Sequence, residues 1–72
     1  AIYPNPTSSI LNIENAENAT IKIYDLLGRL ILTKSNISTH EKINVSNLNT
    51  GTYIIQFKNE NIFATDKFII SK

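Results

Sequence analysis

Residues 20–33 have the sequence TIKIYDLLGRLILT, and this stretch determines the fold class. From Thr20 to Tyr24, apolar and polar residues alternate with a period of two, as they do in a strand with one buried face. The DLLG at 25–28 places aspartate first and glycine fourth, which suits a type I turn closed by a glycine with positive φ. Because residues 29–33 return to strand-forming types, the sequence predicts a β-hairpin here.

Other short strand-forming segments lie on both sides of this hairpin. We expect strands within 10–14, 41–45, 52–57 and 62–71, the last of them bent near 65–66. Polar residues and turn formers separate these segments, and no segment has apolar side chains at helical spacing. About six or seven short strands, with a turn about every ten residues, predict an all-β fold, either an antiparallel β-sandwich or a small barrel.

Length and charge exclude several classes of function. The chain has 72 residues and no cysteine, so we expect a single domain over residues 1–72, a fragment of a larger secreted precursor. Seven basic and six acidic residues are scattered singly and give a net charge of +1, which disfavours binding to nucleic acid. No apolar run approaches the ~20 residues that span a bilayer. We therefore expect no nucleic-acid partner and no direct membrane insertion.

The reactive side chains do not form a catalytic or metal-binding pattern. His40 is the single histidine, so a zinc site would have at most one histidine ligand. The carboxylates form no D-x-D-x-D calcium loop, and a chain of this size has no room for a deep cleft around a carboxylate pair. Gly28 and Gly51 are isolated, and a turn explains each of them. The sequence predicts a protein that is not an enzyme and that has no cofactor.

The three tyrosines allow two interpretations. Tyr3, Tyr24 and Tyr53 would form an aromatic platform for a sugar or a single-stranded nucleic acid if they shared one exposed face. Alternatively, Tyr24 and Tyr53 belong to the sheets, with their hydroxyl groups at the rim of the core. We favour the second interpretation, because both residues lie within strand-forming segments.

Five short motifs follow one another along the chain. They are YPNP at 3–6, ILNI at 10–13, IYDLLGRL at 23–30, LNTGTYII at 48–55 and KFIISK at 67–72. In this order they resemble the type A C-terminal sorting domain of the type IX secretion system (the Por secretion system), found on proteins exported by certain gram-negative bacteria. A glycine that often follows the PNP in that family is absent from residues 7–9. The resemblance assigns structural positions to Tyr3, Pro4, Asn5, Pro6, Asp25, Gly28, Leu48, Gly51 and Tyr53.

The resemblance implies both a fold and a function. The fold would be an immunoglobulin-like antiparallel β-sandwich of about seven short strands. The domain would be a non-catalytic C-terminal secretion signal behind an upstream cargo domain. The cargo would cross the periplasm, and the outer-membrane type IX translocon and its shuttle proteins would recognise the folded signal. A surface sortase-like peptidase would then remove the signal and attach the cargo to the cell surface, or the cargo would be secreted.

A signal that is recognised as a folded domain must present a surface. We expect that surface to be the last strand, at the edge of a sheet, where a partner can add a strand of its own. Alternate side chains such as Phe68 and Ile70 would dock or pack, whereas Lys67 and Lys72 would orient the partner or prevent aggregation. A weak homodimer through edge strands is also compatible with this picture. The predicted signal residues are Lys67, Phe68, Ile69, Ile70, Ser71 and Lys72.

Two other function classes compete with the secretion signal. One is an immunoglobulin-like or carbohydrate-binding accessory module that is retained on a multidomain surface protein. The other is a structural spacer in an adhesin. An accessory module of this kind would need an exposed aromatic strip or a calcium site, and the sequence gives no clear sign of either.

Overall fold

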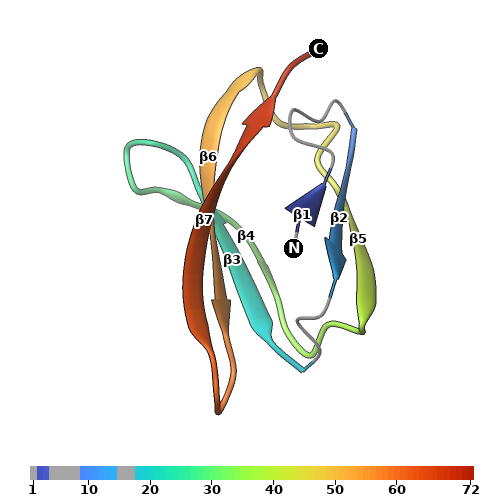
Figure 1. Cartoon of the computed structure of the whole chain (residues 1–72). Coiled ribbons are helices and arrows are strands. Elements are labelled where there is room, and N and C mark those ends of the chain that lie inside the picture. Colours follow the sequence, from blue (N-terminus) through green and yellow to red (C-terminus); the bar gives the residue numbers. More distant parts are fainter. Residues whose placement is uncertain (1, 4–8, 15–17) are drawn as a thin grey trace.

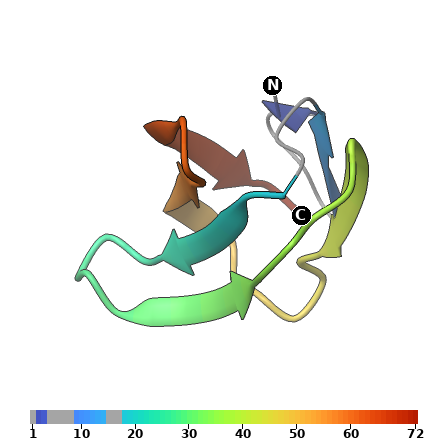
Figure 2. The ribbon, with the colours of Figure 1, turned by 90° about the horizontal axis from the view of Figure 1, so that it is seen from below.

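The protein is described by a computed structural model, which covers residues 2–3, 9–14 and 18–72 (Figure 1). Over these ranges the regular secondary structure consists of strands alone. The strands are β1 (Ile2–Tyr3), β2 (Ile10–Glu14), β3 (Thr20–Tyr24), β4 (Leu30–Lys34), β5 (His40–Asn44), β6 (Gly51–Lys58) and β7 (Phe63–Ile70). They form two antiparallel sheets with the orders β1-β2-β5 and β4-β3-β6-β7, which make two layers (Figure 2). The predicted all-β sandwich is confirmed.

The order of the strands is immunoglobulin-like. The first, second and fifth strands form one sheet, and the third, sixth and seventh lie together in the other. In constant-type immunoglobulin domains the fourth strand joins the first sheet, whereas here β4 pairs with β3. The hydroxyl group of Tyr53, near the start of β6, donates a hydrogen bond of 2.8 Å to the carbonyl of Asn49. This contact corresponds to the tyrosine corner of immunoglobulin-like sandwiches.

The core lies between the two sheets and is built by the period-two pattern of the strands. Side chains at alternate positions of β2, β3 and β6 are buried, while their neighbours are more exposed. Tyr53, Ile55 and Phe57 of β6 share the buried face, since none is more than 9% exposed. The fully buried large side chains are Leu11, Ile13, Ile21, Ile23, Ile37, Val45, Ile55, Phe68 and Ile70. Burial of each such side chain contributes about 1.5–3 kcal/mol to folding.

The predicted boundaries of β4, β5, β6 and β7 each differ from the structure by one residue. The return strand of the hairpin begins at Leu30 rather than Arg29, because the backbone N–H of Arg29 is bonded to the Asp25 carboxylate in the turn. The last strand pairs with β6 from Phe63 to Ile70 without a register shift, so the ladder is not interrupted at the bend expected near 65–66.

The segment between β4 and β5 is the predicted polar loop, but it also contributes to the core. Ile37 is only 2% exposed. Its backbone N–H donates to the carbonyl of Ala19 at 3.2 Å, and its carbonyl accepts from the N–H of Asn18 at 2.9 Å. These bonds attach the loop to the start of β3 and close one end of the sandwich.

Candidate recognition surface at the C-terminal strand

The Asp25–Gly28 turn is held together by the Asp25 side chain. One carboxylate oxygen accepts hydrogen bonds from the backbone N–H groups of Leu27 at 2.9 Å and Arg29 at 3.0 Å. The other accepts from Arg29 Nε at 2.7 Å. The N–H of Gly28 donates to the Asp25 carbonyl at 3.1 Å, and Gly28 has a φ of +83°, so the predicted type I turn and positive-φ glycine are confirmed. This rigid turn exposes Leu26 and Leu27 by 66% and 82%.

The same contacts make the stability of the domain depend on pH. The backbone N–H of Arg29, followed by its guanidinium group, lowers the pKa of Asp25 below its ordinary value of 3.8. A carboxylate with a lowered pKa in the folded state stabilises that state above its ordinary pKa, and this stability is lost as the pH falls through the folded-state pKa. We therefore expect Asp25→Asn to lose less stability than the wild type on acidification from about pH 5 to pH 2. Urea-unfolding midpoints across this range measure the difference, and equal pH slopes would contradict it.

The 47–51 turn leads into β6, close to the point where Tyr53 contacts the C-terminal strand. Leu48 packs against the core, and its N–H donates to the carbonyl of Val45 at 3.0 Å. The ring of Tyr53, two residues after Gly51, stacks on the ring of Phe68 with a centroid distance of 5.7 Å. The turn, the tyrosine corner and the last strand therefore form one packed unit, which gives Leu48 and Tyr53 structural roles.

The C-terminal strand β7 lies at the edge of the four-stranded sheet, as predicted (Figure 1). Phe68 and Ile70 are fully buried, so of the two roles considered for them, docking and packing, the structure gives them packing. Lys67 and Ile69 alternate with them and are exposed. Ser71 and Lys72, which follow the strand, are exposed as well.

The side chain of the last residue contacts the loop that follows β5. Lys72 Nζ donates a hydrogen bond of 2.6 Å to the carbonyl of Ser46, which directly follows the β5 region. Because both groups are exposed, this contact contributes little to stability. It does place Lys72 beside the 47–51 turn rather than on the open edge of β7.

The first half of β7 is the more accessible half. From Phe63 to Lys67 every residue is exposed, including Ala64 and Asp66, which lie opposite the core-facing Phe57 and Ile55 of β6. In the described part of the chain, β7 pairs with β6 alone. This half-strand is therefore open on both faces and along its edge.

The charged side chain of Asp66 lies on this edge strand and is directed to the inner face of the sheet. A charged side chain directed to the inner face of an edge strand is a known guard against uncontrolled pairing. One carboxylate oxygen of Asp66 also accepts a hydrogen bond of 2.8 Å from the backbone N–H of Lys67. An N–H bonded in this way does not take part in the ladder with β6, so it faces the open edge.

The other predicted structural positions lie at the N-terminal end. The backbone of Tyr3 pairs with Asn12 in the β1–β2 ladder. Pro4, Asn5 and Pro6 lie outside the described residues. The structural positions predicted for these three residues stay predictions.

The alternative chemistries find little support in the described residues. Tyr24 and Tyr53 point to opposite faces of the four-stranded sheet, because Tyr24 is paired with the outward-facing Ile54 and Tyr53 is buried, so they form no common platform. His40 Nδ1 lies 3.4 Å from a Glu14 carboxylate oxygen. Within residues 9–14 and 18–72, no three potential metal ligands gather. Among the same residues, no helix is long and apolar enough to cross a membrane.

Comparisons with known proteins agree with the order of the motifs. The family model for the secretion system C-terminal sorting domain, Por_Secre_tail, matches residues 1–71. A stretch of 55 residues is 36% identical to Beta-agarase D from Zobellia galactanivorans; it covers 76% of this chain and 11% of the agarase. Domains of this family are non-catalytic signals that direct a cargo protein through type IX secretion to the cell surface or the medium. The chain belongs to the family of type IX secretion system C-terminal sorting domains.

Proposed function

We propose that the outer-membrane type IX translocon recognises this chain as a folded domain, through the open edge of β7. The observation that carries the proposal is the exposure of Phe63–Lys67 on both faces and along the edge, while Phe68 and Ile70 anchor the strand in the core. A partner strand added at this edge would gain main-chain hydrogen bonds without unfolding the sandwich. Because this edge exists only in the folded sandwich, such a signal would extend over a whole domain instead of a short peptide.

The direction of the backbone groups makes the proposal specific. Adjacent residues of an antiparallel strand direct their N–H groups to opposite sides. Since the Lys67 N–H is bonded to the Asp66 carboxylate rather than to β6, the N–H of Thr65 also faces the open edge. The N–H of Ala64 then faces β6. A partner strand would bond to the Thr65 N–H and would replace the Asp66 carboxylate at the Lys67 N–H.

Proline substitutions separate edge recognition from folding. Thr65→Pro removes an N–H that faces the open edge, and an edge strand tolerates proline in that orientation. Ala64→Pro removes an N–H from the ladder with β6 and should destabilise the domain. We expect a reporter fused to residues 1–72 with Thr65→Pro to remain folded and to lose most of its export from a type IX-competent strain. Circular dichroism of the purified domain and the amount of reporter in the medium and on the cell surface provide the two measurements.

The outcome that would overturn edge recognition is equally specific. A Thr65→Pro domain with a wild-type melting curve and wild-type export would exclude the edge as the recognised surface. Failure of the unmodified fusion to leave the cell, in a strain that exports its own cargo, would exclude the signal function itself. The Ala64→Pro fusion shows how much export is lost when folding alone is impaired.

The later fate of the domain follows from the family. We propose that the cargo passes through the periplasm on its way to the translocon, and that a surface sortase-like peptidase then removes the domain and joins the cargo to the cell surface. A size shift of the surface-bound reporter, lost in a strain without the peptidase, tests this step. A second copy of the chain is a weaker partner for the edge, because pairing two β7 strands around Asp66 brings two carboxylates together.

A further inference from the structure

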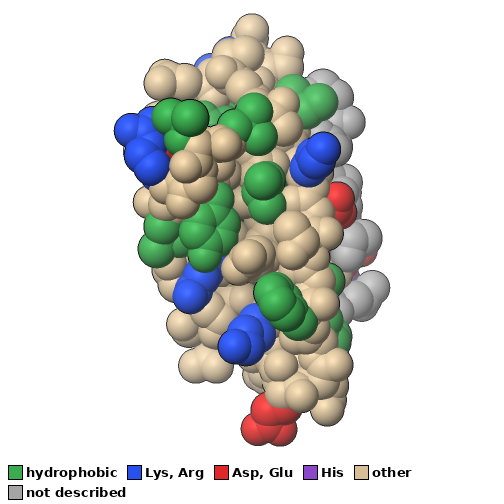
Figure 3. Space-filling model, turned by 90° about the vertical axis from the view of Figure 1, so that its left-hand side faces the viewer, with side chains coloured by type: hydrophobic (Ala, Val, Ile, Leu, Met, Phe, Trp, Pro, Cys, Tyr) green, Lys and Arg blue, Asp and Glu red, His purple; other side chains and the backbone are tan. Residues whose placement is uncertain are grey.

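The outer face of the four-stranded sheet has a composition unlike that of the rest of the molecule. Because Ile21, Ile23 and Phe68 point into the core, their strand neighbours point outward. Figure 3 views the molecule from the side of this sheet, and basic and hydrophobic side chains are interspersed across it. We name it the lysine face; its charged residues are Lys22 of β3, Lys58 of β6 and Lys67 of β7.

The charges on this face are not balanced locally. Lys22, Lys58 and Lys67 are all exposed, and none forms an ion pair with a described residue. The strands β3, β6 and β7 contain one acidic residue, Asp66, and it lies opposite the core-facing Ile55, on the other side of the sheet. Glu60, in the β6–β7 turn, is the acidic residue at the end of the face.

Other acidic side chains in the described part of the chain already have partners. Asp25 is paired with Arg29, and Glu41 is paired with Lys34, at 2.7 Å and 2.6 Å respectively. Glu14 lies beside His40 on the other sheet. Three of the five basic side chains that form no ion pair with a described residue therefore lie on one face of a chain whose net charge is only +1.

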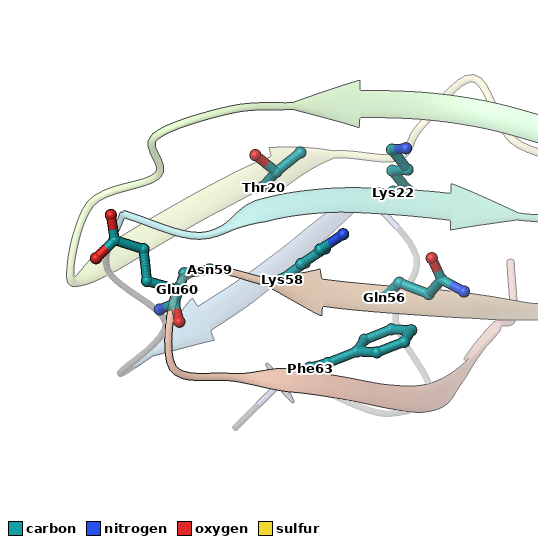
Figure 4. Close-up of a pocket in the computed structure, with 7 residues that line it drawn as sticks. All are labelled: Thr20, Lys22, Gln56, Lys58, Asn59, Glu60 and Phe63. Atoms are coloured by element: carbon teal, nitrogen blue, oxygen red, sulfur yellow. The ribbon is translucent and has the colours of Figure 1, made fainter.

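Two shallow hollows lie on this face, and apolar side chains contribute to the lining of both. One, of about 590 Å³, is lined by Lys22, Lys58 and the 70% exposed Phe63 (Figure 4). The other, of about 400 Å³, lies beside the hairpin turn and is lined by Tyr24 and Ile54 among others. Exposed aromatic and aliphatic groups beside such hollows are typical anchor points in protein–protein interfaces.

We propose that the lysine face binds an acidic protein surface of the secretion machinery; this inference rests on the proposed function and adds a second contact to the β7 edge. Carboxylates of the partner would pair with the three lysines, and apolar side chains of the partner would enter the two hollows. Complementary charge of this kind speeds the encounter and fixes the orientation of the partner. Lys67 belongs to both surfaces, so the partner that adds a strand at the edge meets the lysine face next to it.

A protein is a better occupant than a lipid surface or a nucleic acid. Lipid headgroups are recognised by clusters of about four to eight basic residues, more than this face has. Nucleic-acid binding also depends on a dense basic stripe. The strand β1 belongs to the opposite sheet. A cargo domain joined ahead of β1 would therefore leave the lysine face accessible to a protein partner.

Charge reversal tests the lysine face in the same export assay. The test variant carries Lys22→Glu, Lys58→Glu and Lys67→Glu. The control carries Lys34→Glu, Lys42→Glu and Lys72→Glu, which change the net charge equally at exposed positions off this face; Lys34→Glu also removes the exposed ion pair with Glu41, so the control bears the larger burden on folding. We expect the test fusion to lose most of its export while the control fusion keeps most of it, with both domains folded by circular dichroism. The corresponding triple Lys→Arg variant of the face keeps the charge and should be exported.

Each outcome decides the inference. Export of the test variant at the wild-type level overturns the lysine face and leaves edge recognition standing, since Thr65→Pro tests the edge separately. Equal loss in the test and control variants also overturns it, because net charge would then be the cause. Sedimentation with phosphatidylglycerol vesicles is the third measurement. Wild-type binding to these vesicles that the test variant lacks would assign the face to lipid, whereas no binding supports a protein partner.

Discussion

Phe68→Ala is expected to remove a large part of the stability of the domain. The Phe68 side chain is fully buried and stacks on Tyr53 across the β6–β7 ladder. Truncation of a buried phenylalanine to alanine costs about 3–5 kcal/mol. A domain of this size has a total stability of about 4–11 kcal/mol. The substitution would therefore remove much of the free energy of unfolding, and a urea-unfolding curve measures the loss.

The neighbouring Ile69 supplies the matched control for this substitution. Ile69 lies in the same strand but is 46% exposed and points to the outer face. We expect Ile69→Ala to cost less than about 1 kcal/mol, within the range of surface substitutions. Similar losses for Phe68→Ala and Ile69→Ala would mean that β7 is not anchored by one buried face.

Deletion of Phe68–Lys72 is expected to have the largest effect of all, a chain that does not fold. The deletion removes two fully buried side chains, Phe68 and Ile70. It also removes the ladder partners of residues 51–53, where β6 begins and the tyrosine corner forms. Circular dichroism should then show no cooperative thermal transition.

The matched control is deletion of Ser71 and Lys72 alone. These two residues follow β7, and Lys72 Nζ donates a hydrogen bond to the exposed Ser46 carbonyl. We expect this shorter deletion to keep a cooperative transition close to that of the wild type, because an exposed contact contributes at most about 1 kcal/mol. A folded five-residue deletion would contradict the packing role of Phe68 and Ile70. Loss of export after that deletion cannot by itself identify a recognised strand, because the fold is lost as well.

The features that depend on neighbouring residues were predictable from the sequence. The Asp25–Gly28 turn was predicted because its chemistry is local: one aspartate accepts the turn N–H groups and one glycine supplies the positive φ. The strands of the core were predicted because period-two alternation is visible in the chain itself. The sorting-domain family was identified from the order of the motifs along the chain.

The features that depend on distant residues were not predictable in the same way. Ile37 stands alone among polar residues in the sequence, and it is buried because hydrogen bonds to Asn18 and Ala19 hold its loop at the core. The lysine face was missed because Lys22, Lys58 and Lys67 lie far apart in the chain and meet only through the register of β3, β6 and β7. The alternation of each lysine with buried neighbours was the available signal, but the order of the strands was needed to use it.

The accessible half of β7 is the clearest such case. The sequence predicts signal residues at 67–72, among which the structure buries Phe68 and Ile70 and bonds Lys72 to the Ser46 carbonyl. The open stretch of the strand is instead Phe63–Lys67. The difference arises because Ala64 and Asp66 of the edge strand are exposed although their partners in β6, Phe57 and Ile55, are buried, and the strand pairing was needed to see this.

The most direct test of this account is the export of a reporter fused to residues 1–72 that carries Phe68→Ala. This substitution changes one of 72 residues and leaves the linear sequence of every other motif intact, but it removes the side chain that anchors β7. If the secretion machinery recognises a folded surface, the amount of reporter in the medium and on the cell surface should fall in parallel with the folded fraction. The Ile69→Ala fusion, which is folded and has an intact β7 edge, should be exported. Export of the unfolded Phe68→Ala fusion at the wild-type level would mean that the signal is a linear peptide, and would contradict the account.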